Sequence, residues 1–301
     1  MAVTATGQPT VDLREPSGWR RAKSQVATGA MWFAFLCMLV PLGFVLSTVI
    51  AKGASAISWQ FLTDSTIPPN IEPASIGGMG AAVVGTLEIT GFAALIAIPL
   101  GVLGAVFLNE YGGGRPLARL LSFLSDVMTG VPSIVMGLFI FTVWVIPRGL
   151  TGLSGMAGSF ALACLMLPVV IRSSHEMLRL VPDQLREASY ALGATKARVT
   201  LTVVLPTAVG GIVSGALLAV ARAAGETAPL LFTIGTVEAT NPNLFSGADT
   251  ALSTQIFMNA QEPYAGAIAR GWGAALALIA ISFILMIVAR LITARFSRYS
   301  R

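Results

Sequence analysis

The chain has 301 residues, of which 55% are hydrophobic and only 11% are charged, with a formal net charge of +5. Soluble domains carry about 25% charged residues, so a soluble chain of this composition would lack the charge needed to cover its surface. The basic residues are spread in small groups between apolar runs, which suits loops at an anionic membrane surface and excludes a nucleic-acid-binding protein.

Six apolar stretches are long enough to cross a membrane, because a bilayer core of about 30 Å needs roughly 20 apolar residues in a helix. We predict an all-α transmembrane bundle over residues 28–294, with a cytoplasmic N-terminal tail at 1–27 and a cytoplasmic C-terminal tail at 295–301. The apolar run before Ala54 is longer than the roughly 7–15 residues of a cleavable signal peptide, so we expect it to remain as an anchor. The predicted spans are Thr28–Ile50, Gly80–Leu108, Val127–Ile146, Gly155–Ile171, Thr207–Gly225 and Gly271–Ile292.

Two connections on the predicted outside, Ala51–Met79 and approximately Thr227–Arg270, are rich in Pro, Asn, Ser and Thr. We expect them to be irregular or partly interfacial. Prolines within the spans should kink helices, and a bundle tolerates such kinks when neighbouring groups satisfy the backbone. These prolines are Pro41, Pro99, Pro132 and Pro168.

The basic residues also predict the orientation, because cytoplasmic loops carry an excess of Lys and Arg. With the N-terminus in the cytoplasm, three basic residues lie outside, namely Lys52, Arg148 and Arg270, and fifteen lie inside. The inside group is Arg14, Arg20, Arg21, Lys23, Arg115, Arg119, Arg172, Arg179, Arg186, Lys196, Arg198, Arg290, Arg295, Arg298 and Arg301. We therefore expect both termini in the cytoplasm.

The connection from Val181 to Pro206 is too polar to enter lipid, yet its apolar residues recur at helical spacing. Pro182 and Asp183 suit the first turn of a helix, and Gly193 is where a helix would stop. We predict a short amphipathic helix at the cytoplasmic surface, a turn, and a return to the membrane at Leu205-Pro206. From spacing alone, an ordinary basic interfacial helix is the leading alternative.

The same connection resembles the coupling signature of type I ABC importer permeases, which is Glu-Ala-Ala, a glycine and then Ile-x-Leu-Pro. Matching positions are Glu187, Ala188, Gly193, Leu205 and Pro206, while Ser189 and Val203 replace an alanine and the isoleucine. The resemblance implies that this helix docks on an ATPase subunit. The chain has no Gly-x-x-x-x-Gly-Lys-Ser/Thr loop. We therefore expect no enzymatic activity and no cofactor in this chain, with ATP and Mg bound by a separate P-loop ATPase.

Arg222 lies well inside a predicted span, about 15 residues past Thr207 and hence about 22 Å along the helix. A charge at that depth costs at least about 2.5–3.5 kcal/mol, so such side chains usually face the bundle interior or a watery path. A structural ion pair with Glu226 or with Glu88 is one explanation. A site for a tetrahedral oxyanion is the other, since the planar guanidinium suits such anions.

Further segments resemble the PstA family, the permease subunits of phosphate-specific ABC importers. The segments are GETAPL (Gly225–Leu230), ISWQFL (Ile57–Leu62), GGMGAAVVGTL (Gly77–Leu87), NEYGG (Asn109–Gly113) and VIRSSHEMLRLVP (Val170–Pro182). Ala81 departs from the family, which usually has proline there. The resemblance implies a multi-pass protein of the bacterial cytoplasmic membrane in which Arg172, Arg222 and Glu226 serve the anion path. For Arg172, a snorkelling residue at the membrane surface is the alternative.

The partners implied are a second homologous permease, two copies of the ATPase, an extracytoplasmic phosphate-binding protein and membrane lipid. Other tetrahedral oxyanions, such as sulfate or molybdate, remain alternative substrates, and a non-ABC secondary transporter remains an alternative mechanism. A membrane enzyme is not indicated, because the chain has no Gly-x-Ser-x-Gly or His-Glu-x-x-His motif and His175 is its one histidine. No metal site is expected. His175 is predicted to lie at the surface, and Cys37 and Cys164 are interpreted as small apolar residues.

Overall fold

A computed structural model describes residues 18–68, 70–71 and 77–297, and these residues fold into helices without a β-strand. The chain divides into two compact units, the first ending at Thr48 and the second beginning at Val49. Each unit is described by itself. The predicted all-α fold class is confirmed. Of the inside basic residues, Arg14, Arg298 and Arg301 lie outside the described residues.

The first unit consists of most of helix α1 (Gly18–Gly53). This helix starts ten residues before the predicted span, so residues 18–27 of the predicted tail are helical. Large apolar side chains such as Trp32 and Phe44 are 62% and 72% exposed. A helix that is apolar on all sides is typical of a membrane span.

In the second unit, four helices are long and apolar enough to cross a membrane. Together with α1 they make five candidate spans, or six when one bent helix pair is counted as a span, which agrees with the predicted number. The four are α3 (Gly80–Val106) with its π turn η1 (Phe107–Tyr111), α7 (Gly155–Arg179), α9 (Lys196–Val199) continuing through η4 (Thr200–Val204) into α10 (Leu205–Ala224), and α13 (Ala265–Ser297).

The predicted span Val127–Ile146 is wrong as a single helix. The structure has α4 (Pro116–Gly130) and α5 (Ser133–Ile140), which are bent by 107° at the break between them. Pro132 lacks an N–H, and a residue before proline is pushed towards extended backbone. Val131 and Pro132 accordingly have ψ values of 129° and 138°.

Two other prolines are accommodated without a break, because each follows a π turn. In η2 (Phe141–Val145), the N–H of Ile146 bonds to the carbonyl of Phe141, just before Pro147 in α6 (Ile146–Arg148). In η4, the N–H of Leu205 bonds to the carbonyl of Thr200, just before Pro206. This wider turn eases the clash between a proline ring and the preceding turn. The helix therefore runs on from Lys196, earlier than the predicted re-entry at Leu205-Pro206.

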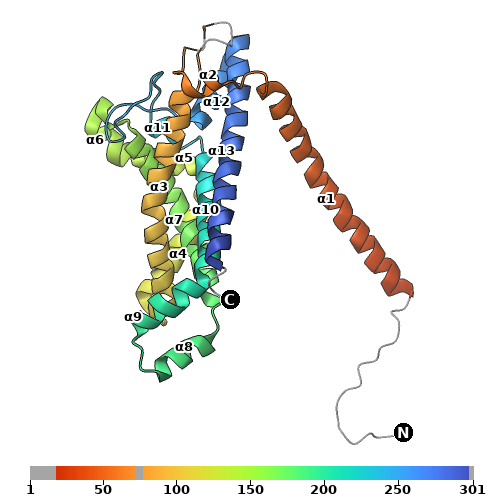
Figure 1. The fold of residues 1–301 in the computed structure, drawn as a ribbon, viewed down its shortest axis with the longest axis vertical. Helices are drawn as coiled ribbons and strands as arrows, with labels where there is room; N and C mark the ends of the chain where they lie inside the picture. Colours follow the sequence, from red (N-terminus) through yellow and green to blue (C-terminus); the bar gives the residue numbers. More distant parts are fainter. Residues whose placement is uncertain (1–17, 69, 72–76, 298–301) are drawn as a thin grey trace, which may run out of the picture. The chain divides into compact units, whose positions relative to one another are not determined.

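The core of the second unit lies where α3, α7 and α10 pack together on small residues (Figure 1). A side chain added at Gly211 or Gly215 of α10 would collide with Met177 or Ser173 of α7, and one at Gly101 of α3 would collide with Val170. Small residues thus let these helix backbones approach closely, as in other membrane bundles.

The outer connections are more ordered than predicted. They contain α2 (Trp59–Thr63), α11 (Leu230–Thr233) and α12 (Leu252–Gln261), and η3 (Gly149–Gly152) follows α6. Helix α12 packs on α13 and α3, and buries polar residues such as Gln255 and Asn259. The polar sequence of α12 gives no sign of this burial. Asn259 donates hydrogen bonds to the backbone carbonyl and the side-chain oxygen of Gln255, so these polar groups bond within the protein instead of to water.

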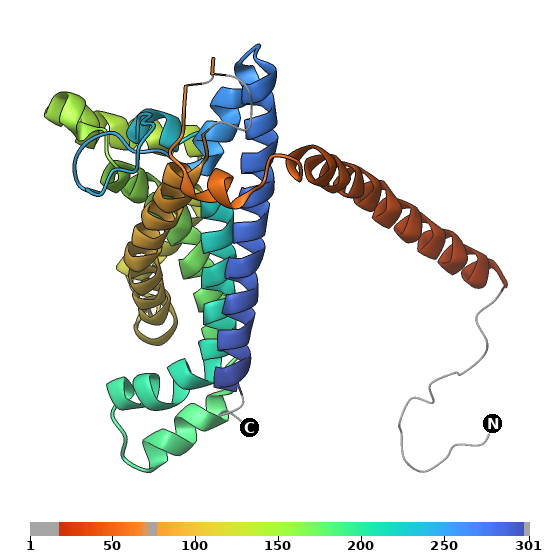
Figure 2. The same ribbon diagram turned by 45° about the horizontal axis from the view of Figure 1, so that its top comes forward.

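The connecting segments gather at opposite ends of the second unit (Figures 1 and 2). Helix α8 (Asp183–Ala191) and α9 form a hairpin at one end, where α13 also finishes. Helices α2 and α12 lie at the other end. Arg270, predicted to lie outside, donates to the carbonyl of Ile71 at that second end. Arg186 and Lys196 of the predicted inside group belong to the hairpin, at the end opposite to Arg270.

Candidate anion path and coupling loop

A cavity of about 260 Å³ lies where the break between α4 and α5 faces α7 and α10. Thr129, Pro132 and Ser133 line it at the break, and Arg222 and Glu226 line it at the end of α10. The start of α5 adds N–H groups without helical partners and the positive end of a helix dipole, which both favour an anion. The same proline that breaks the predicted span therefore helps to shape this cavity.

Arg222 is paired within the cavity, since its Nε atom lies 3.6 Å from Oε1 of Glu226. Glu226 lies just past α10, where its N–H donates to the carbonyl of Ala223 and its own carbonyl accepts from Ser253 of α12. The Arg222 side chain is 73% exposed although it is paired. Of the two partners that the sequence leaves open, the structure has Glu226.

Glu88, the other predicted partner, lies near Asp249 in the outer connection. Burial raises the pKa of the Asp249 carboxyl. The backbone N–H of Thr250 donates a hydrogen bond that opposes this rise in the pKa, and the negative charge of Glu88 adds to it.

Arg172 lies on α7 one turn beyond Val169, which lines the cavity. Its Nη1 atom is 3.2 Å from Oδ1 of Asp126 on α4, and its Nε atom is 3.8 Å from Oε1 of Glu176. The Arg172 and Asp126 side chains are 60% and 66% exposed. Asp126 was not predicted from the sequence, because its closeness to Arg172 depends on the α4–α7 packing.

The coupling loop has the predicted start and stop. Helix α8 begins at Asp183 after Pro182 and ends before Gly193, which has a φ of +78°. The N–H of Gly193 donates to the carbonyl of Tyr190, and the N–H of Ala194 donates to that of Ser189. This is the Schellman pattern, in which a left-handed residue ends the helix.

The outer surface of this loop is exposed and partly apolar. Leu185 and Leu192 are 42% and 89% exposed, and Glu187 and Ala188 of the signature are also exposed. Leu205 and Pro206 instead belong to the start of α10. The loop therefore presents a short rigid helix whose apolar side chains are available to a partner.

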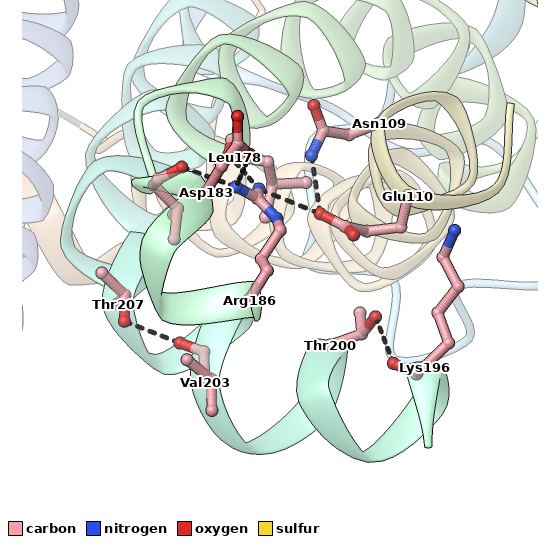
Figure 3. A network of polar contacts seen from close by, with 10 residues as sticks. Asn109, Glu110, Leu178, Asp183, Arg186, Lys196, Thr200, Val203 and Thr207 are labelled. Atoms are coloured by element: carbon pink, nitrogen blue, oxygen red, sulfur yellow. Dashed lines mark hydrogen bonds and ion pairs between the residues drawn. The ribbon is translucent and has the colours of Figure 1, made fainter. Parts of the chain in front are cut away.

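A polar network behind the loop was missed by the sequence analysis (Figure 3). It centres on Arg186, counted only as a basic residue of the cytoplasmic side, and on Glu110 of the NEYGG segment. The one feature of the sequence that could have indicated this network is Glu110, an acidic residue at the end of an apolar span. Which cation faces it depends on the tertiary fold.

Among the described residues, no group of three or more His, Cys, Asp and Glu side chains is placed to hold a metal ion. His175 is half-buried rather than at the surface, and its Nδ1 atom is buried. The reason is its position on α7, whose close packing with α3 covers that face.

Residues 97–298 match the model of the family described as binding-protein-dependent transport system inner membrane component. The phosphate transport system permease protein PstA 1 of Mycobacterium tuberculosis is 42% identical, over 93% of this chain and 91% of that protein. The PstA protein of Yersinia pestis is 38% identical, over 94% of each. The chain belongs to the PstA family of transport permeases. The predicted family is thus confirmed.

Solved structures support the fold alone. The inward-facing MetNI methionine ABC transporter matches with a TM-score of 0.56 and 23% identity, over 72% of this chain and 97% of that one. A bacterial alginate ABC transporter, solved with an alginate-bound periplasmic protein, matches with a TM-score of 0.62 and 15% identity, over 93% of this chain and 98% of that one. The PstA-family chain therefore has the type I ABC importer permease fold, and it is a multi-pass membrane subunit.

Proposed function

We propose that this chain is the permease subunit of an ATP-driven importer of inorganic phosphate and forms one side of the path across the bacterial cytoplasmic membrane. The observation that carries the proposal is the cavity beside the α4–α5 break, where Arg222 is exposed within a PstA-family fold. Phosphate is the substrate in the names of its relatives.

The partners follow from family membership and from the exposed coupling helix. A second homologous permease completes the path, and two copies of a P-loop ATPase bind ATP and Mg. An extracytoplasmic phosphate-binding protein delivers the anion. The coupling loop faces the cytoplasm, as do both termini, in agreement with the distribution of basic residues.

Arg222 and Arg172 offer two successive positions for a passing anion. Their exposed side chains already pair with carboxylates, at Glu226 and Asp126. Neither guanidinium is enclosed by this chain, so an oxyanion that accepts two parallel N–H bonds can reach it and replace the carboxylate. The carboxylates keep the arginines neutralised between transport events, and phosphate exchanges with them in turn.

The experiment compares Arg222→Gln, Glu226→Gln and the double variant in ATP-dependent phosphate uptake. If the two residues only stabilise each other, each single change leaves an unpaired charge and the double variant recovers function. If Arg222 meets the anion, the double variant stays inactive although the complex assembles, and Arg222→Lys is impaired because an ammonium lacks the planar fork. We expect the second pattern.

Arg148→Gln is the matched control, because Arg148 is an arginine outside this cavity that lies 3.6 Å over the ring of Trp144. It should transport as the wild type does. Full uptake by an assembled Arg222→Gln complex would remove Arg222 from the path.

A further inference from the structure

Arg186 of α8 and Glu110 of η1 form a buried ion pair at the cytoplasmic end of the bundle. The Nη2 atom of Arg186 is 3.1 Å from Oε1 of Glu110, and the two side chains are only 13% and 5% exposed. Asn109 donates a second hydrogen bond, of 2.7 Å, to the same oxygen. The Arg186 side chain is thus far more buried than those of Arg222 and Arg172, which are 73% and 60% exposed.

The same guanidinium also closes the end of α7. Its Nη2 atom donates to the carbonyl of Leu178 at 3.0 Å, and its Nη1 atom donates to that of Val181 at 2.6 Å. Carbonyls at a helix C-terminus have no partner within the helix, and a cation there is favoured by the helix dipole. One side chain of α8 therefore holds the ends of both α3 and α7 (Figure 3).

The other limb of the hairpin contacts the same π turn. The Nζ atom of Lys196, the first residue of α9, lies 5.2 Å from the ring centroid of Tyr111 in η1. Glu110 and Tyr111 of η1 thus contact the hairpin on both sides of Gly193, and Asn109 supports Glu110. Apolar packing adds to these contacts, because Val199 of α9 is buried in one cluster with Ala105 of α3 and Leu178 of α7.

We propose that Glu110 is a positioning residue for transport: through Arg186 it fastens the coupling helix to α3 and α7, so that a displacement of α8 moves the transmembrane helices instead of bending the loop. This inference rests on the proposed docking of α8 on the ATPase. A surface ion pair separates at little cost, because water solvates both charges. Separation of a buried pair is costly, because it leaves an unpaired charge inside the protein. Salt-bridge networks and rigid helices are among the structures that carry coupling between sites.

The test measures phosphate molecules transported per ATP hydrolysed, in liposomes that contain the whole complex. Glu110→Gln keeps the size of the side chain but removes its charge. We expect this variant to assemble with the ATPase and to hydrolyse ATP, while transport per ATP falls at least about fivefold, the lower end of usual coupling between sites. Glu110→Asp keeps the charge and should retain part of the coupling.

Asp183→Asn is the matched control. Asp183 accepts a hydrogen bond of 3.0 Å from the same guanidinium, but its side chain is 87% exposed. It should leave transport per ATP unchanged. An unchanged ratio in Glu110→Gln, an equal loss in Asp183→Asn, or failure of Glu110→Gln to assemble would each overturn the inference, the last because the pair would then serve folding alone.

A separate arm tests the docking on which the inference rests. A cysteine in place of the exposed Leu192, labelled with a thiol-reactive photocrosslinker, should become covalently linked to the ATPase subunit in the otherwise unchanged complex. Absence of that cross-link would contradict the proposed docking itself. A cross-link together with an unchanged transport ratio in Glu110→Gln would contradict only the role of Glu110.

Discussion

Burial separates the arginines of this chain into two sets. Arg222 and Arg172 are paired but 73% and 60% exposed, and under the proposed function an anion replaces their carboxylate partners. Arg186 is paired and largely buried, so its partner is fixed. The sequence shows the charge of each residue and the depth of Arg222. It does not show whether a charge is covered, because burial depends on helices distant in the chain.

The role of Arg172 can be tested by a single substitution. A snorkelling residue and a residue that contacts phosphate require different properties of the side chain. A snorkelling residue needs only a positive charge on a long stem, so Arg172→Lys would transport normally. A residue that meets phosphate needs the planar fork. We expect Arg172→Lys to lower the uptake rate roughly tenfold, equivalent to about 1.4 kcal/mol, with assembly unchanged. Initial rates of labelled phosphate uptake measure this.

Asp126→Asn is the control for the Arg172 variants, since it removes the carboxylate and leaves the arginine. The pair is exposed, so the loss should be within about fivefold. Normal uptake by Arg172→Lys would show that Arg172 is a snorkelling residue.

At the scale of helices, apolar runs predict the long elements well and their interruptions poorly. Five predicted spans correspond to long helices because lipid requires continuous apolar length. Pro132 was predicted to kink a helix, but it ends one, whereas Pro206 is absorbed by a π turn. The difference lies in the preceding backbone, which is extended at Val131 before Pro132 and forms a π turn before Pro206. Helix α12 was missed because its polar residues are satisfied within the protein.

Gly193 provides the test at this scale. A side chain there meets open space, since an added Cβ has no atom within 4 Å, so the demand for glycine comes from its φ of +78° alone. A left-handed conformation costs most residues about 1–2 kcal/mol and costs Asn less. We expect Gly193→Val to lose phosphate-stimulated ATP hydrolysis and uptake, and Gly193→Asn to keep much of both. Equal activities in the two variants would contradict a backbone cause.

For the whole molecule, the second unit has two chemically different ends. One end carries the α8–α9 hairpin with Arg186 and Lys196 and lies beside the end of α13, while the other carries Arg270 and the outer helices. The cavity lies at the α4–α5 break, and the buried Arg186–Glu110 pair joins the hairpin to η1. The fold, the bounds of helix α8 and the possible Arg222–Glu226 pair were predictable because each depends on local sequence. The cavity and the Glu110 network were not, because several distant segments build them.

The central claim is that this permease carries phosphate through a path driven by a separate ATPase. The most direct measurement is uptake of labelled phosphate into liposomes that contain the complete complex and its binding protein, with ATP supplied on the ATPase side. We predict uptake that requires ATP and continues in the presence of excess unlabelled sulfate or molybdate. Uptake without ATP, or transport of sulfate or molybdate in preference to phosphate, would contradict the account.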